Sequence, residues 1–354
     1  QLKALTIAQV AGLTTAQLNS MGSTQISQLK ADQLPALSTT TLNQLDANVL
    51  GGLSGTQVLG LTTSQITGMS TTALSRLSTA ALAAFKTNQI VALNTAQLAS
   101  LSSSATMALT VTQIAALETR DLANLTTANF AVLFSTQVGA LTTAQLVSLK
   151  SDALASLSTS ALAGLTTSQI VALTTDQIAT LTTSQLAAFT TAQLVKMETD
   201  DLAAITTDQI TAVKTAQIAA LTTDQVVALT TDQVSTLTTS QLAAFTTAQL
   251  VTMETDDVQA ITTAQITGLK TAQIASLTAD QVVALTTDQT AALSTAQIAA
   301  ITTAQLVTME TDDVAAITTD QITALTTAQM VALTTAQTVT LTSDQLATLK
   351  TAQV

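Results

Sequence analysis

The feature that most constrains this chain is an eight-residue repeat that runs through residues 5–349 without an insertion or a deletion. Residues 221–229, LTTDQVVAL, contain one such octad and the first residue of the next. With Leu221 as position 1, Thr222 is position 2, Gln225 is position 5 and Val226 is position 6. Position 1 is Leu, Ile, Val, Met or Phe in all 44 octads, and position 6 is apolar in 41 of them. Because a fixed short period forces every octad to make the same contacts, this repeat decides the fold.

Within each octad the residues predict one very short helix. Thr222 and Gln225 have the spacing of a capping box, in which a hydroxyl at the N-cap and an amide at the third helical residue bond each other's backbone N–H. Leu221 and Val226 then take the two places of a hydrophobic staple. Asp224 falls in the first turn, where the helix dipole favours an acid. We therefore expect a helix of one to one and a half turns, followed by a tight redirection through position 1.

The predicted fold is all-α: a solenoid of very short helices, one per octapeptide repeat. A single long helix is excluded, because an apolar stripe with a period of eight would drift around it by about 80° per repeat. A β-solenoid is the alternative, since Thr, Val and Ile suit strands, but Ala and Gln are abundant. Pro35 at position 7 indicates either a distorted octad or an early helix end. Six glycines at position 8 are expected to stop the helix, namely Gly12, Gly52, Gly60, Gly68, Gly164 and Gly268.

Repeat quality divides the chain into three regions. Residues 1–68 hold degenerate octads and are a candidate N-terminal cap, and residues 69–164 hold intermediate octads. Residues 165–354 are near-ideal octads with a longer super-repeat of seven octads, in which METDD begins at Met197, Met253 and Met309. This period indicates tandem duplication of a seven-octad block. Alternatively, seven octads approximate a superhelical turn or a lateral contact spacing, with lysines at position 2 forming a sparse basic row.

The METDD segments raise the question of metal binding, because calcium takes clustered oxygen ligands. We predict no metal site, since no glycine-containing calcium loop accompanies them and each acid has a helical role as cap, first-turn acid or third-residue acceptor. If calcium were bound, its candidate ligands would be Glu198, Asp200, Asp201, Glu254, Asp256, Asp257, Glu310, Asp312 and Asp313.

What the composition lacks restricts the function. The chain has no Cys, His, Trp or Tyr, so the common nucleophile–base pairs and metal ligands are missing, and we expect neither an enzyme nor a cofactor. The net charge of −12 repels nucleic acid, and no apolar run is long enough for a membrane span. The first residues, QLKALTIAQV, already belong to the repeat and show no signal peptide, so we expect that any targeting segment has been removed or lies at the far end of a longer protein.

Each octad offers only two large apolar side chains, a thin core that favours association with further copies. We therefore expect a homo-oligomer or filament, and a structural repeat protein that serves as an extracellular filament subunit or adhesin stalk. One alternative is a binding module that presents rows of Thr to ice or polysaccharide. Contact with polysaccharide or with a cell surface is accordingly a candidate partner interaction. The other alternative is an acidic calcium-dependent surface scaffold.

Two resemblances follow from these residues. LTTDQVVAL is similar to the start of the first helix of transcription-activator-like effector repeats. The repeat length, the missing base-reading loop and the acidic charge differ from that family, so the resemblance does not imply DNA binding. All 44 octads resemble the long Thr/Ala/Gln-rich repeat segments of large bacterial surface and adhesin-like proteins. This resemblance implies a secreted, structural or adhesive role at the cell surface or outside the cell.

Overall fold

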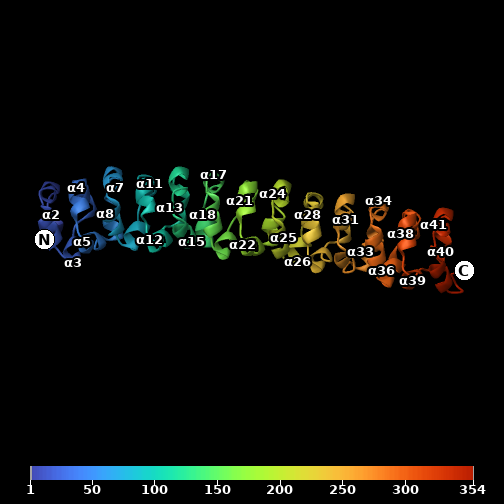
Figure 1. Cartoon of the computed structure of the whole chain (residues 1–354). Coiled ribbons are helices and arrows are strands. Elements are labelled where there is room, and N and C mark those ends of the chain that lie inside the picture. The colour runs from blue at the N-terminus through green and yellow to red at the C-terminus, as the bar shows by residue number, and fades with distance from the viewer. Residues whose placement is uncertain (1, 354) are drawn as a thin grey trace. The chain divides into compact units, whose positions relative to one another are not determined.

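A computed structural model describes residues 2–353. The chain divides into two compact units, Gln1–Leu181 (unit 1) and Thr182–Val354 (unit 2), which have the same architecture. Within each unit, short helices follow one another as a coil (Figure 1). The division into three regions of repeat quality stays a prediction.

Unit 1 begins with a short 3₁₀ helix and continues with one helix per octad. Its elements are η1 (Leu2–Ala4), α1 (Ile7–Ala11), α2 (Thr15–Ser20), α3 (Ser23–Ile26), η2 (Ala31–Ala36), α4 (Thr39–Gln44), α5 (Ala47–Gly51), α6 (Gly55–Val58), α7 (Thr63–Gly68), α8 (Thr71–Ser75), α9 (Thr79–Ala83), α10 (Thr87–Val91), α11 (Thr95–Ala99), α12 (Ser103–Ala108), α13 (Val111–Ala116), α14 (Thr119–Leu122), α15 (Thr127–Ala131), α16 (Ser135–Gly139), α17 (Thr143–Val147), α18 (Ser151–Ser156), α19 (Thr159–Leu162), α20 (Thr167–Ala172) and α21 (Thr175–Thr180).

Unit 2 repeats the pattern with more uniform octads. Its elements are α22 (Thr183–Ala188), α23 (Thr191–Leu194), α24 (Thr199–Ala203), α25 (Thr207–Ala212), α26 (Thr215–Ile218), α27 (Thr223–Val227), α28 (Thr231–Thr236), α29 (Thr239–Leu242), α30 (Thr247–Leu250), α31 (Thr255–Ala260), α32 (Thr263–Ile266), α33 (Thr271–Ser276), α34 (Ala279–Val283), α35 (Thr287–Ala292), α36 (Thr295–Ala300), α37 (Thr303–Leu306), α38 (Thr311–Ala316), α39 (Thr319–Ile322), α40 (Thr327–Ala332), α41 (Thr335–Val339) and α42 (Ser343–Thr348).

The octad folds as its capping residues predict. At the start of α27, Thr222 is the N-cap, its hydroxyl accepts the Gln225 N–H at 3.2 Å, and the Gln225 Oε1 accepts the Thr222 N–H at 3.0 Å. The helix ends within two turns, and extended backbone at positions 1 and 2 leads to the next one. The all-α solenoid of very short helices is thus confirmed, and residues 2–353 contain no strand of the alternative β-solenoid.

Successive coils stack on one another with a turn of about three and a half octads. In unit 2, α22 packs against α25 and α28 against α31, three octads further along the chain. The Gln241 Nε2 donates to the carbonyls of Val213 and Ile210, which lie 28 and 31 residues earlier in the chain. These carbonyls belong to the preceding coil, which we call the coil below. A period of 28 residues corresponds to 3.5 octads, so the super-repeat of seven octads spans two turns. The interpretation of seven octads as a single superhelical turn was wrong, because each coil contacts the coil below after half that length.

The core of each unit is formed by positions 1, 5 and 6. In a typical octad Leu221, Gln225 and Val226 are 5%, 2% and 0% exposed, while Thr222, Thr223 and Asp224 lie on the surface. Burial of the two apolar side chains agrees with the predicted staple. Burial of an amide side chain beside them was not expected, and this amide determines how the coils are joined.

Pro35 distorts its octad rather than ending the helix early. Residues Ala31–Ala36 form the 3₁₀ helix η2 with Pro35 inside it, whereas neighbouring octads form α-helices. Since proline has no N–H to donate to the preceding turn, this octad tightens into a 3₁₀ helix. Gln33 in the same octad still reaches the coil below, where it donates to Leu5 O at 2.7 Å.

The glycines at position 8 lie at or just after the ends of their helices, as predicted, and Gly12 and Gly52 are themselves C-caps. Among the described residues no glycine has a positive φ, so none of them ends a helix in the left-handed conformation. In addition, several of these glycines lie against position 3 of the coil below. A Cβ at Gly60 would collide with Ala31 O, and a Cβ at Gly164 would collide with Ser135 O. Glycine is needed here for the close approach of two coils.

We predict that Gly60→Ala lowers the stability of unit 1 by about 2 kcal/mol, because the new methyl group must push the two coils apart. Gly12→Ala, also at position 8, is the matched control. Its nearest contacts would be 3.6 Å away, so its effect should stay within about 0.5 kcal/mol. Urea-induced unfolding followed by circular dichroism measures both, and equal unfolding midpoints for the two variants would contradict this account.

Candidate functional site

The repeated feature with the most specific geometry is the position-5 glutamine. In Gln225, Oε1 accepts the Thr222 N–H, while Nε2 donates to Leu194 O and Met197 O, both at 2.9 Å. Gln233 repeats this arrangement with Leu202 O at 2.9 Å and Ile205 O at 2.6 Å. One buried amide therefore caps its own helix and ties that helix to two carbonyls of the coil below. We call this series of contacts, made by the position-5 glutamines, the glutamine ladder.

The ladder gives each coil a direction. The glutamine amide N–H groups project from one face of a coil and donate to main-chain carbonyls of positions 1 and 6 on the facing side of the previous coil. A hydrogen bond between buried groups contributes about 1 kcal/mol, and a buried carbonyl without a donor costs more than that. The ladder donors and acceptors of a coil are therefore all satisfied only when another coil lies on each of its two faces.

Where position 5 is not glutamine, some octads use another donor. Position 5 is Ala73 in one octad, and Arg76 of the same octad donates from its guanidinium to Leu45 O at 2.5 Å. Asn129 is one carbon shorter than glutamine, and its Nδ2 still donates to Leu101 O, 28 residues earlier, at 2.9 Å. A side chain of asparagine length can therefore reach the coil below.

In the three octads that begin at Met197, Met253 and Met309, called here the METDD octads, the ladder residue is an aspartate. Asp257 is 3% exposed, and its Oδ2 has no hydrogen-bond partner. Burial raises its pKa from the usual 3.8 to about 6, and the negative charges of Glu254 and Asp256 add to the shift. Asp201 and Asp313 have the same burial, the same unpartnered Oδ2 and a pKa raised to about 6 for the same reasons.

The acids of the METDD octads only partly follow their predicted helical roles. Glu254 occupies the N-cap position, but its side chain makes no cap hydrogen bond. Asp256 lies exposed in the first turn, as a first-turn acid should. Asp257 forms no capping box with Glu254, so its predicted role as third-residue acceptor is wrong. Length does not prevent this contact, because the Oδ1 of Asn129, a side chain of the same length, accepts the N–H of its N-cap Thr126 at 3.1 Å. The negative charge of Glu254 distinguishes the Asp257 octad.

The acidic side chains form no metal-binding cluster in the described chain. Within residues 2–353, no three acidic side chains, those of the METDD octads included, lie close enough together to hold a metal ion. Asp121, also at position 5, accepts a hydrogen bond from the Thr95 hydroxyl and lies 3.4 Å from the Arg120 Nε. Threonine hydroxyls at position 2 serve the caps, which leaves the exposed row at position 3, such as Thr223, as the freer one.

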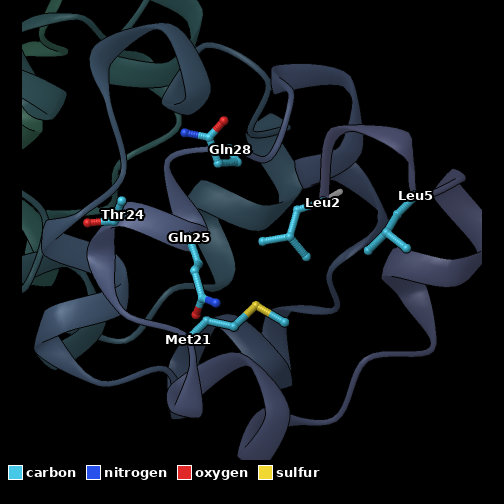
Figure 2. A pocket seen from close by; sticks show the side chains of 6 residues that line it. All are labelled: Leu2, Leu5, Met21, Thr24, Gln25 and Gln28. Carbon is cyan, nitrogen blue, oxygen red and sulfur yellow. The ribbon is translucent and has the colours of Figure 1, made fainter.

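The first coil of unit 1 has a hollow on the face that no coil of the described residues covers. A cavity of about 600 Å³ is lined by Leu2, Leu5, Met21, Thr24, Gln25 and Gln28. Figure 2 shows Leu2, Met21 and Gln25 around the same space. Among residues 2–353, no carbonyl pairs with the Nε2 of Gln9, Gln17 or Gln25, which are the ladder residues of this coil. This face therefore has apolar side chains and unused amide donors.

Fold and ladder together define a class of protein, an α-solenoid of capped octapeptide helices. Within that class, the chain belongs to the ALTTAQ repeat family, whose sequence profile matches residues 114–151, 147–183, 183–215, 211–239, 250–287, 267–295 and 306–343. No curated protein matches the chain. In the described part of the chain, every helix falls short of the length and apolar character needed to cross a membrane.

We predict that Gln225→Ala lowers the stability of unit 2 by about 3 kcal/mol, because the Thr222 N–H and the Met197 carbonyl lose their partner. The Leu194 carbonyl loses one of its two donors and keeps the Met197 N–H. Asp224→Ala, at the exposed position beside it, is the control and should change stability by less than about 0.5 kcal/mol. The measurement is the midpoint of urea-induced unfolding, with amide hydrogen exchange to locate the loss. An unchanged midpoint and unchanged exchange near Leu194 and Met197 would show that the ladder contributes nothing.

Proposed function

We propose that this chain is a structural repeat protein that associates end to end with further copies of itself, as a filament subunit or adhesin stalk at the cell surface. The observation that carries this proposal is the direction of the glutamine ladder. Every coil presents donors on one face and acceptors on the other, so a stack of coils can be extended by any other coil of the same kind.

The face with donors is on the first coil. Gln9, Gln17 and Gln25 are exposed, whereas Gln33, the first glutamine with a coil below it, is buried and donates to the carbonyls of Leu2 and Leu5. Beside these donors lies the apolar hollow around Met21. A carbonyl-bearing coil placed below would satisfy the three amides and cover the hollow.

The face with acceptors is on the last coil. Gln353 is the last ladder residue, and it donates to Ile322 O and Leu325 O. The carbonyls of the next three octads receive no glutamine amide in the described chain, and they belong to Met330 and Leu333, Thr338 and Leu341, and Leu346 and Leu349. Within the described residues, the last coil of unit 2 therefore has three pairs of acceptors, and the first coil of unit 1 has three amide donors.

Apolar side chains accompany these carbonyls. Val331 and Val339 at position 7 are 80% and 76% exposed, about twice the 41% of Val227, which has a coil above it. Leu346 at position 6 is 50% exposed, whereas Val226 at the same position is fully buried. Covering this surface would add hydrophobic stabilisation to the hydrogen bonds.

A location outside the cell is part of the proposal and rests on composition. Low charge content, the absence of cysteine and the very high content of Thr, Ala and Gln are typical of long repeat segments of bacterial surface proteins. A structural role also suits a chain that has neither His nor Cys for catalysis.

The proposal is tested by measuring self-association of the 354-residue chain. Sedimentation velocity over a range of concentrations should show a series of multiples of the monomer, and electron microscopy should show filaments. The variant Gln9→Glu/Gln17→Glu/Gln25→Glu should stay monomeric, because carboxylates would face the incoming carbonyls without a proton to donate.

A matched control adds the same charge elsewhere. Ala216→Glu/Ala248→Glu/Ala264→Glu places three acids at exposed position 4, where Asp224 and Asp232 occur naturally. This variant should associate like the unchanged chain. Monomers at all concentrations of the unchanged chain, or equal association of the two charged variants, would refute the end-to-end contact.

A further inference from the structure

We call the contacts of one position-5 side chain with the coil below a rung of the ladder. At three rungs in unit 2 this side chain can gain or lose a proton. The rung requires a donor that points to the coil below, and glutamine and asparagine always have one. An aspartate has a donor only when its carboxyl group is protonated. At Asp201, Asp257 and Asp313 the ladder therefore depends on the protonation state of a side chain.

The chain itself shows that a side chain of this length can form the rung. The Nδ2 of Asn129 donates to Leu101 O, 28 residues earlier, at 2.9 Å. Asparagine and aspartate differ only in the amide group, so a protonated carboxyl at the same position has the same reach. In unit 2 the equivalent carbonyls, at the same separation along the chain, are Leu229 O for Asp257 and Leu285 O for Asp313.

The helices packed against these carboxyl groups carry only negative charges in the described chain. The helix α31 of Asp257 packs against α28 and α34, whose charged residues are Asp232 and Asp280. The helix α38 of Asp313 packs against α35, which carries Asp288, and against α41, which has no charged residue. The helix α24 of Asp201 packs against α27, which carries Asp224. Glu and Asp in each METDD octad itself add two more negative charges.

We propose that Asp201, Asp257 and Asp313 make unit 2 sensitive to pH. When protonated, the carboxyls of Asp257 and Asp313 each donate an O–H to a main-chain carbonyl of the coil below within unit 2 and close the ladder there. When such a carboxyl loses the proton to water, a buried carboxylate is left facing carbonyl oxygens, and the contact between the two coils loosens. The device is independent of end-to-end association, because its three aspartates lie inside the stack.

The pKa shifts fix the direction and the range of the effect. All three aspartates have a pKa raised from 3.8 to about 6 by burial, with the neighbouring acids adding to it. A pKa that is higher in the folded than in the unfolded chain stabilises the fold fully below the unfolded value. This stabilisation is lost as the pH rises through about 6, so the free energy of unfolding of unit 2 should be higher at pH 5 than at pH 7.5.

The super-repeat sets the spacing of these rungs. Asp201, Asp257 and Asp313 follow one another at intervals of seven octads, and one turn takes half of that interval. They therefore recur at the same rotational position on every second turn of unit 2, and loosening at all three would act along one side of the coil. Tandem duplication explains how the three copies arose, and the two-turn period explains why they align.

The test compares the unchanged chain with Asp201→Asn/Asp257→Asn/Asp313→Asn by amide hydrogen exchange at pH 5 and pH 7.5, corrected for intrinsic exchange. In the unchanged chain, protection of the METDD octads and of the coils below them should fall about tenfold or more between the two pH values. In the triple Asp→Asn variant this fall should disappear, since a permanent donor keeps the ladder closed.

Asp200→Asn/Asp256→Asn/Asp312→Asn is the matched control. It removes the same number of charges from exposed neighbours and should keep the fall in protection, apart from a small general charge effect. An equal fall in the unchanged chain and in the variant of the three buried aspartates, or no fall in the unchanged chain, would overturn the proposal.

A second measurement does not depend on any variant. Carboxyl groups of the unchanged chain labelled with ¹³C at aspartate can be titrated by nuclear magnetic resonance. Asp201, Asp257 and Asp313 should titrate near pH 6, because burial raises their pKa. If no aspartate signal titrated near pH 6, the proposal would be overturned.

Discussion

The structure depends on the three hydrogen bonds of one side chain. In each regular octad a buried glutamine amide accepts the N–H of its own N-cap and donates to two carbonyls of the previous coil, as Gln225 does. The two apolar side chains of an octad are too few to hold the coils by hydrophobic burial alone. The amide supplies the missing connection, and because every regular octad has one, the fold can be repeated without change.

Departures from this pattern follow from the same requirement for a donor. Arg76 replaces the missing amide of an alanine octad, and Asn129 replaces glutamine with a shorter amide. The aspartates of the METDD octads are different, because they keep the position and the burial but carry the donor only when protonated. Position 8 has a parallel restriction, since at Gly60 and Gly164 two coils approach too closely for a side chain.

The direction of the glutamine ladder is the basis for the proposed association of the chain with further copies. The first coil of unit 1 has unused donors and the last coil of unit 2 has unused acceptors, so the two coils are complementary, and apolar side chains lie beside both, around Met21 in the first and Leu346 in the last. A repeat that joins coil to coil within the chain can join chain to chain by the same contacts. Membership of the ALTTAQ repeat family agrees with a structural repeat, while the surface location rests on composition.

The sequence alone determined the local structure. The cap at Thr222, the acceptor at Gln225 and the staple of Leu221 and Val226 act within one octad, so their spacing was enough to predict a short helix in every octad. Only the tertiary structure decided that the glutamine Nε2 bonds the coil below, that a turn takes about 28 residues, and that Asp257 is buried without a partner for its Oδ2. These features depend on groups of the neighbouring coils that are far away along the chain, and a uniform period of eight does not show how many octads complete a turn.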